Sequence, residues 1–346
     1  MFNIINNISL FQHSHSARKP LALAIGNFDG CHRGHQSLIQ QLVNLAKQKG
    51  ASAGVLTFDP RPEAFFRQFG AETLLFTREQ KSRAFEELGV DFHILQEFDF
   101  AFSRLSHVEF FEDLLVKQLG IKVLVVGADF KFGAGRLGNI DYLKSACEKF
   151  SIDFQPLFPV LIDASEKSPQ ISSTRIRQSL LNEGDCQLVA KMLGRPYLVE
   201  GLIKSGDKIG RQLGFPTLNL EPERAQLLPK NGVYSAYVAL PENLSAGKKV
   251  FIPPIFPDYK SLAPAAVNIG LRPTLQQNLP ELRIEAHLLD RKLAMELDSR
   301  PMGIYFVERI RDEKKFADLD ELKANIANDI LACRQSLANH KATDFC

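Results

Sequence analysis

The chain has 346 residues, which is enough for two domains and too long for one ordinary core, and 45% of them are hydrophobic and 24% charged, as in globular proteins. Its formal net charge of +2 gives no electrostatic argument for a nucleic-acid partner. The five widely spaced cysteines argue against a disulfide framework and favour a reducing, cytoplasmic location.

In the N-terminal half, apolar runs typical of strands alternate with amphipathic segments typical of helices. Strands are expected at residues 21–25, 53–58, 91–95 and 123–126, and helices at residues 37–49, 79–88 and 108–119. This alternation predicts a parallel, doubly wound sheet of the Rossmann-like α/β class. No basic segment precedes a long hydrophobic stretch near the N-terminus, so neither a signal peptide nor a membrane partner is expected.

Three loops of unusual composition follow three of these predicted strands. They cover residues 26–35, 59–63 and 127–138. Because ligands of open α/β sheets bind beyond the carboxyl ends of the strands, the three loops are expected to form a single site.

The C-terminal half has a different pattern, with short runs of β-forming residues separated by Gly, Pro and Asn turns. Strands are expected at residues 197–203, 232–240, 265–269, 283–289 and 303–310, followed by a helix at residues 319–331. This pattern predicts an antiparallel barrel or sandwich with a terminal helix. The Pro-rich residues 241–264 are expected to be a long excursion between two strands. We place the domains at residues 1–187 and 188–346.

Residues 26–35 read G-N-F-D-G-C-H-R-G-H and place His32 and His35 at the start of a predicted helix. Positions i and i+3 share a helix face, so both imidazoles can address one ligand. A helix N-terminus favours an anion, and Gly34 permits close approach of a nucleotide. A turn with two surface histidines is the structural interpretation of the same residues. A metal site is a further alternative, but no cysteine or carboxylate pattern supports it.

A second candidate begins at residue 171 and reads I-S-S-T-R-I-R. Three consecutive hydroxyls at the start of a helix are a common capping pattern, which is the structural interpretation. The functional interpretation adds Arg175 and Arg177, whose guanidinium groups suit a polyphosphate. The two interpretations stay open on these residues alone.

The C-terminal half carries a third candidate, G-R-Q-L-G-F-P-T-L-N at residues 210–219. It is unlike a P-loop. Thr217 and Asn219 are two residues apart and would point the same way on a strand, where a hydroxyl and an amide oxygen suit Mg²⁺ with bound phosphates and water. A turn followed by an edge strand is the structural alternative.

Glu285 lies in a predicted strand whose residues alternate between apolar and polar. A carboxylate on a strand usually belongs to a solvated face. Its functional role would be that of a general base that accepts a proton from a substrate hydroxyl. The residues themselves do not choose between the two.

The motifs together narrow the choice. H-x-G-H with S-S-T-x-I-R resembles the nucleotidyltransferase superfamily. The longer string at residues 26–35, with T-F-D-P-R-P at 57–62 and V-G-A-D-F-K-F-G at 126–133, resembles bacterial FAD synthetase, the bifunctional riboflavin kinase and FMN adenylyltransferase. The resemblance implies that His32, His35 and Arg177 are catalytic, that ATP contacts Gly26, Phe28, Asp29, Gly34, Ser173 and Thr174, and that Phe58, Asp59, Pro60 and Asp129 form the flavin side.

The C-terminal motifs resemble riboflavin kinase in order and spacing, from residues 210–219 through N-I-G-L-R-P-T at 268–274 to E-A-H-L-L-D at 285–290. The resemblance makes Glu285 the base that activates the ribityl 5′-hydroxyl. It implies that Thr217 and Asn219 bind Mg²⁺–ATP, that Gly206, Lys208, Gly210, Arg211 and Pro216 lie at the nucleotide, and that Arg311 lies near the flavin. Residues 291–302 and 241–264 depart from the family pattern.

The expected protein is therefore an enzyme with two active sites that converts riboflavin to FMN and FMN to FAD, with ATP as co-substrate and Mg²⁺ as cofactor. A kinase whose other domain adenylylates a different phosphate is one alternative. A flavin-binding regulator with decayed sites is another. The expected partners are small-molecule substrates, and oligomerisation is left open.

Overall fold

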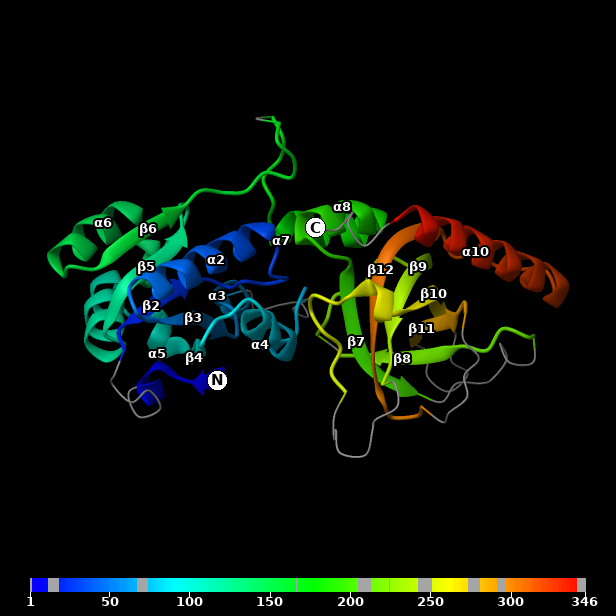
Figure 1. Ribbon diagram of the computed structural model, residues 1–346, viewed down its shortest axis with the longest axis horizontal. Coiled ribbons are helices and arrows are strands. Elements are labelled where there is room, and N and C mark those ends of the chain that lie inside the picture. Colours follow the sequence, from blue (N-terminus) through cyan, green and yellow to red (C-terminus); the bar gives the residue numbers. More distant parts are fainter. Residues whose placement is uncertain are drawn as a thin grey trace. The chain divides into compact units, whose positions relative to one another are not determined.

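The computed structural model describes residues 2–11, 19–66, 74–165, 167–204, 213–223, 225–241, 251–272, 281–290 and 297–340. The chain divides into two compact units, Met1–Ile171 and Ser172–Cys346 (Figure 1). The segment that contains α7 (Ser173–Gln178), the π-helical η4 (Ser179–Glu183) and α8 (Cys186–Leu193) groups with the second unit. The domain boundary that we placed between residues 187 and 188 stays a proposal.

The first unit is built on a parallel sheet, as predicted. Its strands are β1 (Asn3–Asn6), β2 (Leu21–Ile25), β3 (Ser52–Asp59), β4 (Phe92–Glu97), β5 (Ile121–Gly127) and β6 (Asp153–Leu157). Their order is β1-β4-β3-β2-β5-β6, and every neighbouring pair is parallel. The chain proceeds from β2 through β3 to β4 on one side and resumes with β5 on the other. β2 is therefore the point at which the order reverses, where such sheets bind ligands.

Helices connect these strands. They are α2 (Arg33–Gln48), α3 (Pro62–Phe66), α4 (Arg78–Glu87), α5 (Phe100–Ser103), α6 (Ile140–Lys149) and the π-helical η2 (Glu109–Gln118), with 3-10 turns η1 (Ile8–Leu10) and η3 (Ala134–Arg136). All five residues of β2 are buried, as expected for a strand covered on both faces. β1 and β6 were not predicted, because these edge strands are largely exposed or half-buried and lack a continuous apolar run.

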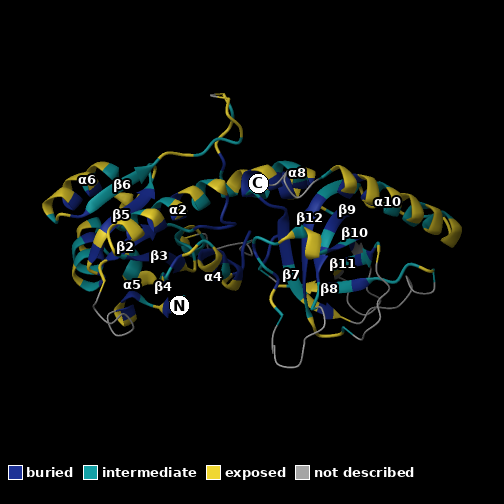
Figure 2. Ribbon diagram, viewed as in Figure 1, coloured by how far each residue is buried: buried dark blue, intermediate teal, exposed yellow. Residues whose placement is uncertain are grey.

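The second unit is a closed barrel, which resolves the alternative between barrel and sandwich. Its strands are β7 (Tyr197–Lys204), β8 (Leu218–Pro222), β9 (Gly232–Ala239), β10 (Ala263–Arg272), β11 (Glu281–Leu288) and β12 (Pro301–Arg311), in the order β10-β11-β8-β7-β12-β9. All neighbouring pairs are antiparallel. The terminal helix α10 (Leu319–Asn339) packs on the barrel and keeps an exposed face (Figure 2).

Two helices are longer than expected. Helix α2 begins at Arg33, four residues before the predicted start, because His32 caps it. Helix α10 continues to Asn339, beyond the predicted end at residue 331. The excursion between β9 and β10 is present, and its described part contains only the 3-10 turn η5 (Tyr259–Ser261), while residues 242–250 lie outside the described residues. Among the described helices, none is long and apolar enough to cross a membrane.

Candidate active sites

The two histidines of the H-x-G-H motif lie against each other at the start of α2. His32 is the N-cap, and its Nδ1 accepts a hydrogen bond from the backbone N–H of His35 at 3.3 Å. The imidazole rings are stacked, with centroids 3.6 Å apart and planes 17° apart. A Cβ on Gly34 would lie 3.2 Å from His32 Nδ1, so glycine leaves room for the ring. The structure thus brings together the three residues at a helix N-terminus, which favours an anion.

Burial keeps His35 uncharged. Desolvation is the main cause that lowers the pKa of His35 well below its usual value, and the nearby charges of His32 and Lys81 lower it further. The buried Nδ1 of His35 has no hydrogen-bond partner among the described residues. A neutral imidazole with one unpaired nitrogen at a helix N-terminus has the capacity to hydrogen-bond a ligand there.

Phe28 packs against the histidine pair through His35. Its side chain is 1% exposed and packs edge-on against His35, with ring centroids 5.2 Å apart, and against Phe85 of α4 at 5.6 Å. Gly26 is equally confined, because a Cβ there would lie 3.1 Å from the Phe28 ring. The contacts of Gly26 and Phe28 with ATP that the resemblance implies stay predictions.

Asp29 is 1% exposed and joins the loop after β2 to two other segments. Its carboxylate accepts hydrogen bonds from the backbone N–H groups of Leu75 and Phe76, at 3.3 and 3.0 Å, and forms an ion pair with Arg61 at 3.0 Å. The Arg61 side chain is itself only 11% exposed. Asp29 therefore fixes the positions of the loops around the histidine pair, and its predicted contact with ATP stays untested.

We expect Asp29→Asn to destabilise the first unit by about 3 kcal/mol, because it removes the negative charge from a buried ion pair with Arg61. Urea unfolding followed by far-UV circular dichroism measures this loss. Asp153→Asn is the matched control, since it removes the more exposed ion pair with Lys49 and should cost less than about 1 kcal/mol. Equal losses in the two variants would contradict a structural role for Asp29.

The loop after β3 carries the residues expected on the flavin side. Phe58 is 9% exposed, whereas Asp59 and Pro60 are exposed. The Phe58 ring packs against Phe98 and Phe102, with centroids 6.0 and 5.7 Å apart. The sequence reasoning missed this aromatic cluster, although the 26 phenylalanines of the chain are a signal for it.

The loop after β5 contains Asp129, which is exposed, and the stacked rings of Phe130 and Phe132, with centroids 5.6 Å apart. Because β5, β2 and β3 are neighbours in the sheet, the loops that follow them lie at one edge. This arrangement confirms that the three loops share the carboxyl edge of the sheet. The role of Asp129 stays a prediction.

The S-S-T motif begins α7, in the second unit. The cap is Ser172, whose hydroxyl accepts a hydrogen bond from the backbone N–H of Arg175 at 3.2 Å. Ser173 and Thr174 are the first two helical residues, and Arg177 is half-buried. The capping interpretation holds for Ser172, and the roles of Ser173, Thr174 and Arg177 at the ATP site stay predictions.

A histidine buried near the first site carries a pH dependence. His93 on β4 has Nε2 2.8 Å from the Thr57 hydroxyl and Nδ1 2.8 Å from the Ser82 hydroxyl, which donates to the Arg78 carbonyl. Nδ1–H therefore donates to Ser82, and Nε2 accepts from Thr57, which is the pattern of a neutral ring. Desolvation and the charges of Lys81 and Arg78 lower its pKa to about 3.

We expect the protein to lose stability as the pH falls from 6.5 towards 3. In this window the unfolded chain binds a proton at His93 that the folded protein does not bind, so His93 contributes fully only above pH 6.5. The loss approaches about 1.4 kcal/mol per pH unit for this group. Urea unfolding at pH 7 and pH 5 measures it, and His93→Gln should make the pH dependence shallower. An unchanged slope in that variant would refute the assignment.

In the barrel, four polar residues form a row across neighbouring strands. In the register, Lys204 of β7 pairs with Asn219 of β8, Asn219 with Glu285 of β11, and Glu285 with Asn268 of β10. Directly opposed residues of antiparallel strands have their side chains on the same face. We call these four residues the polar row. It brings Asn219 next to Glu285, whose roles in the kinase site stay predictions, and it adds Lys204 and Asn268, which the sequence reasoning missed.

The polar row lies on the outer face of the barrel. The alternate residues Ile284, Ala286 and Leu288 of β11 are at most 5% exposed, whereas Glu285 is half-buried. Among the described residues, none donates a hydrogen bond to the Glu285 carboxylate. The role of Glu285 as a general base stays a prediction.

Thr217 precedes β8 and is positioned by a histidine that the sequence reasoning did not single out. His287, two residues after Glu285 on the same face of β11, has Nδ1 2.8 Å from the carbonyl oxygen of Pro216 and its ring edge-on to Phe215. This bond holds the segment that carries Thr217. The spacing of two from Glu285 was the signal available in the sequence.

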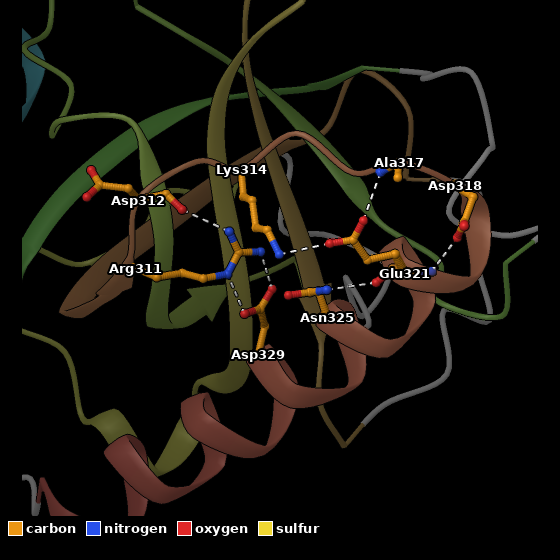
Figure 3. A network of polar contacts seen from close by, with 8 residues as sticks. All are labelled: Arg311, Asp312, Lys314, Ala317, Asp318, Glu321, Asn325 and Asp329. Atoms are coloured by element: carbon orange, nitrogen blue, oxygen red, sulfur yellow. Dashed lines mark hydrogen bonds and ion pairs between the residues drawn. The ribbon is translucent and has the colours of Figure 1, made fainter.

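The other residues predicted for the kinase site are Arg311 and four residues that the structure does not describe. Gly206, Lys208, Gly210 and Arg211 lie outside the described residues. Arg311 donates two hydrogen bonds, at 2.7 and 2.6 Å, to the carboxylate of Asp329 on α10 (Figure 3). The Arg311 guanidinium therefore ties the end of β12 to the terminal helix, and its predicted flavin contact stays untested.

Comparisons with known proteins match the two halves of the chain to two different family models. The family model described as FAD synthetase matches residues 14–175, and the model described as riboflavin kinase matches residues 193–337. A solved structure described as a macrolide-efflux protein from Streptococcus pneumoniae has a TM-score of 0.80 and 26% identity, covering 96% of this chain and 98% of that chain.

Two curated relatives carry the same name, bifunctional riboflavin kinase/FMN adenylyltransferase. The protein from Escherichia coli (strain K12) is 38% identical over 322 residues, covering 93% of this chain and 94% of the relative. The protein from Haemophilus influenzae is 34% identical over 326 residues, covering 93% and 97%. With both family models matched in order and relatives aligned over nearly their full length, the chain belongs to the family of bifunctional riboflavin kinase/FMN adenylyltransferases.

Proposed function

We propose that the chain makes FAD from riboflavin in two ATP-dependent steps. The barrel domain, residues 188–346, phosphorylates riboflavin to FMN, and the domain of residues 1–187 adenylylates FMN to FAD with release of pyrophosphate. The observation that carries this proposal is that one chain holds both the polar row around Glu285 and the stacked histidine pair, each within the matching family model.

In the kinase step, the Glu285 carboxylate accepts the proton of the riboflavin 5′-hydroxyl. The hydroxyl oxygen then forms a bond to the γ-phosphorus of ATP while the bond to the leaving oxygen of ADP breaks. Asn219 of the polar row supports this assignment, because an amide beside the base suits phosphate oxygens.

The residues present fit a magnesium ion at the kinase site. Thr217 and Asn219 offer hydroxyl and amide oxygens, which are the hard ligands that Mg²⁺ prefers. No group of three or more His, Cys, Asp or Glu side chains suited to a metal occurs in the described part of the chain, so phosphates and water would supply the other ligands. When bound, the ion would offset charge on the transferring phosphate.

In the adenylyl transfer, a phosphate oxygen of FMN bonds to the α-phosphorus of ATP, and the bond to pyrophosphate breaks. No protein nucleophile is needed. Cys31, inside the motif, is 0% exposed and takes no part. The neutral His35 and its partner His32 would donate hydrogen bonds to phosphate oxygens as charge develops in the transition state.

A coupled assay tests both steps. The purified protein with riboflavin, ATP and Mg²⁺ should produce FMN first and then FAD, separated by liquid chromatography. If only FMN appears, a panel of other phosphate substrates is assayed by pyrophosphate release. Release with one of them would support the alternative, an adenylyltransferase for a different phosphate. The proposed partners are these small molecules in the cytoplasm, with neither nucleic acid nor membrane.

A further inference from the structure

Asn268 flanks the proposed base on the outer face of the barrel. It pairs directly with Glu285 in the register of β10 and β11, on the side opposite to Asn219. Its neighbours Val267 and Ile269 are 0% exposed and fill the barrel interior, so Asn268 is on the outer face with Glu285. A neutral amide therefore stands next to the carboxylate.

Glu313 reaches the same face because Gly270 has no side chain. Gly270 follows Asn268 by two residues on β10, so both belong to one face. A Cβ on Gly270 would lie 3.2 Å from Asn268 Nδ2 and 3.0 Å from Glu313 Cδ, and it would overlap Glu313 Oε1. Glycine at this position lets the Glu313 carboxylate approach the sheet beside the Asn268 amide. We call this pair of side chains over Gly270 the Gly270 site.

The segment that carries Glu313 is held on both sides. Arg311 binds the Asp329 carboxylate, and Lys314 forms an ion pair with Glu321 at 2.9 Å, so the residues around Glu313 are tied to α10 (Figure 3). Glu313 itself is exposed. The carboxylate thus has a defined position and remains accessible to a ligand.

The chemistry of the Gly270 site suits hydroxyl groups. A carboxylate accepts hydrogen bonds, whereas an amide both donates and accepts them, and hydroxyls also do both. A phosphate is disfavoured there, because the carboxylate would repel it. We propose that Asn268 and Glu313 bind hydroxyls of the polyol chain of the substrate and so deliver its terminal hydroxyl to Glu285. This inference rests on the kinase function proposed above.

The test compares two flavins. Riboflavin carries the polyol chain, whereas lumiflavin carries a methyl group in its place. In the full-length protein, Asn268→Ala and Glu313→Ala should each weaken riboflavin binding by about tenfold, because a hydrogen bond to a hydroxyl is lost. Lumiflavin binding should stay within about twofold, since it makes no such bond. Isothermal titration calorimetry measures both affinities, and steady-state kinetics should show a raised KM for riboflavin with an unchanged KM for ATP.

The controls separate binding from folding. Asp320→Asn removes an exposed carboxylate from the same unit and should leave both affinities unchanged. Unfolding curves confirm that the variants are intact, and Glu313→Gln, which keeps the size of the side chain and an acceptor oxygen, should lose less riboflavin affinity than Glu313→Ala. Equal losses for riboflavin and lumiflavin, or no loss for either, would overturn the proposal. A wild-type protein that bound riboflavin without phosphorylating it would refute the kinase function. The losses of riboflavin and lumiflavin affinity in the variants would still decide whether the Gly270 site binds the polyol chain.

Discussion

Glu285→Ala is expected to lower kcat for FMN formation by about a thousandfold, the contribution typical of a general base. The substitution removes the carboxylate that lies between Asn219 and Asn268. No described residue donates a hydrogen bond to this carboxylate. FAD formation from supplied FMN should continue, because the histidine pair proposed for adenylyl transfer belongs to the other unit. Separate assays with riboflavin and with FMN measure the two activities.

Two further variants make the Glu285 result specific. Glu285→Gln keeps the shape of the side chain and should be nearly as inactive as the alanine variant, since an amide is not a base. Glu308→Ala removes a half-buried glutamate from β12 and should retain kinase activity. A folded Glu285→Ala protein that retained its kinase activity, or lost both activities, would contradict the independent roles of the two sites.

His32→Ala should have the opposite effect, lowering FMN adenylylation by about a hundredfold while FMN formation is spared. The change removes one imidazole of the stacked pair and the hydrogen bond that caps α2, so His35 loses its neighbour. Loss of the cap alone costs about 1 kcal/mol of stability. Initial rates of pyrophosphate release with FMN and ATP measure the effect.

His32→Asn separates the cap from the imidazole. Asparagine is a preferred N-cap, so this variant should recover the stability of α2 and remain deficient in adenylyl transfer. Recovery of the rate together with the stability would show that His32 acts only as a cap. Kinase activity of the same samples serves as the internal reference in each comparison.

Strands were predicted correctly where the residues of the strand itself carry a continuous apolar pattern. The strands at residues 21–25 and 53–58 were predicted because each is a continuous apolar run, and they form β2 and β3 at the centre of the sheet. The edge strands β1 and β6 were missed because they lack such a run. The sequence left barrel and sandwich open, since alternation within a strand does not say how a sheet closes.

By itself, the sequence determined the chemical groups of both candidate sites: two imidazoles at a helix start, a hydroxyl and an amide two residues apart, and a carboxylate on a strand. Only the tertiary structure decided their surroundings. The register placed Asn268 and Lys204 in line with Glu285 and Asn219, and burial committed Asp29 to Arg61. These contacts join residues far apart in the chain, where pairing and desolvation act between segments that no local pattern connects.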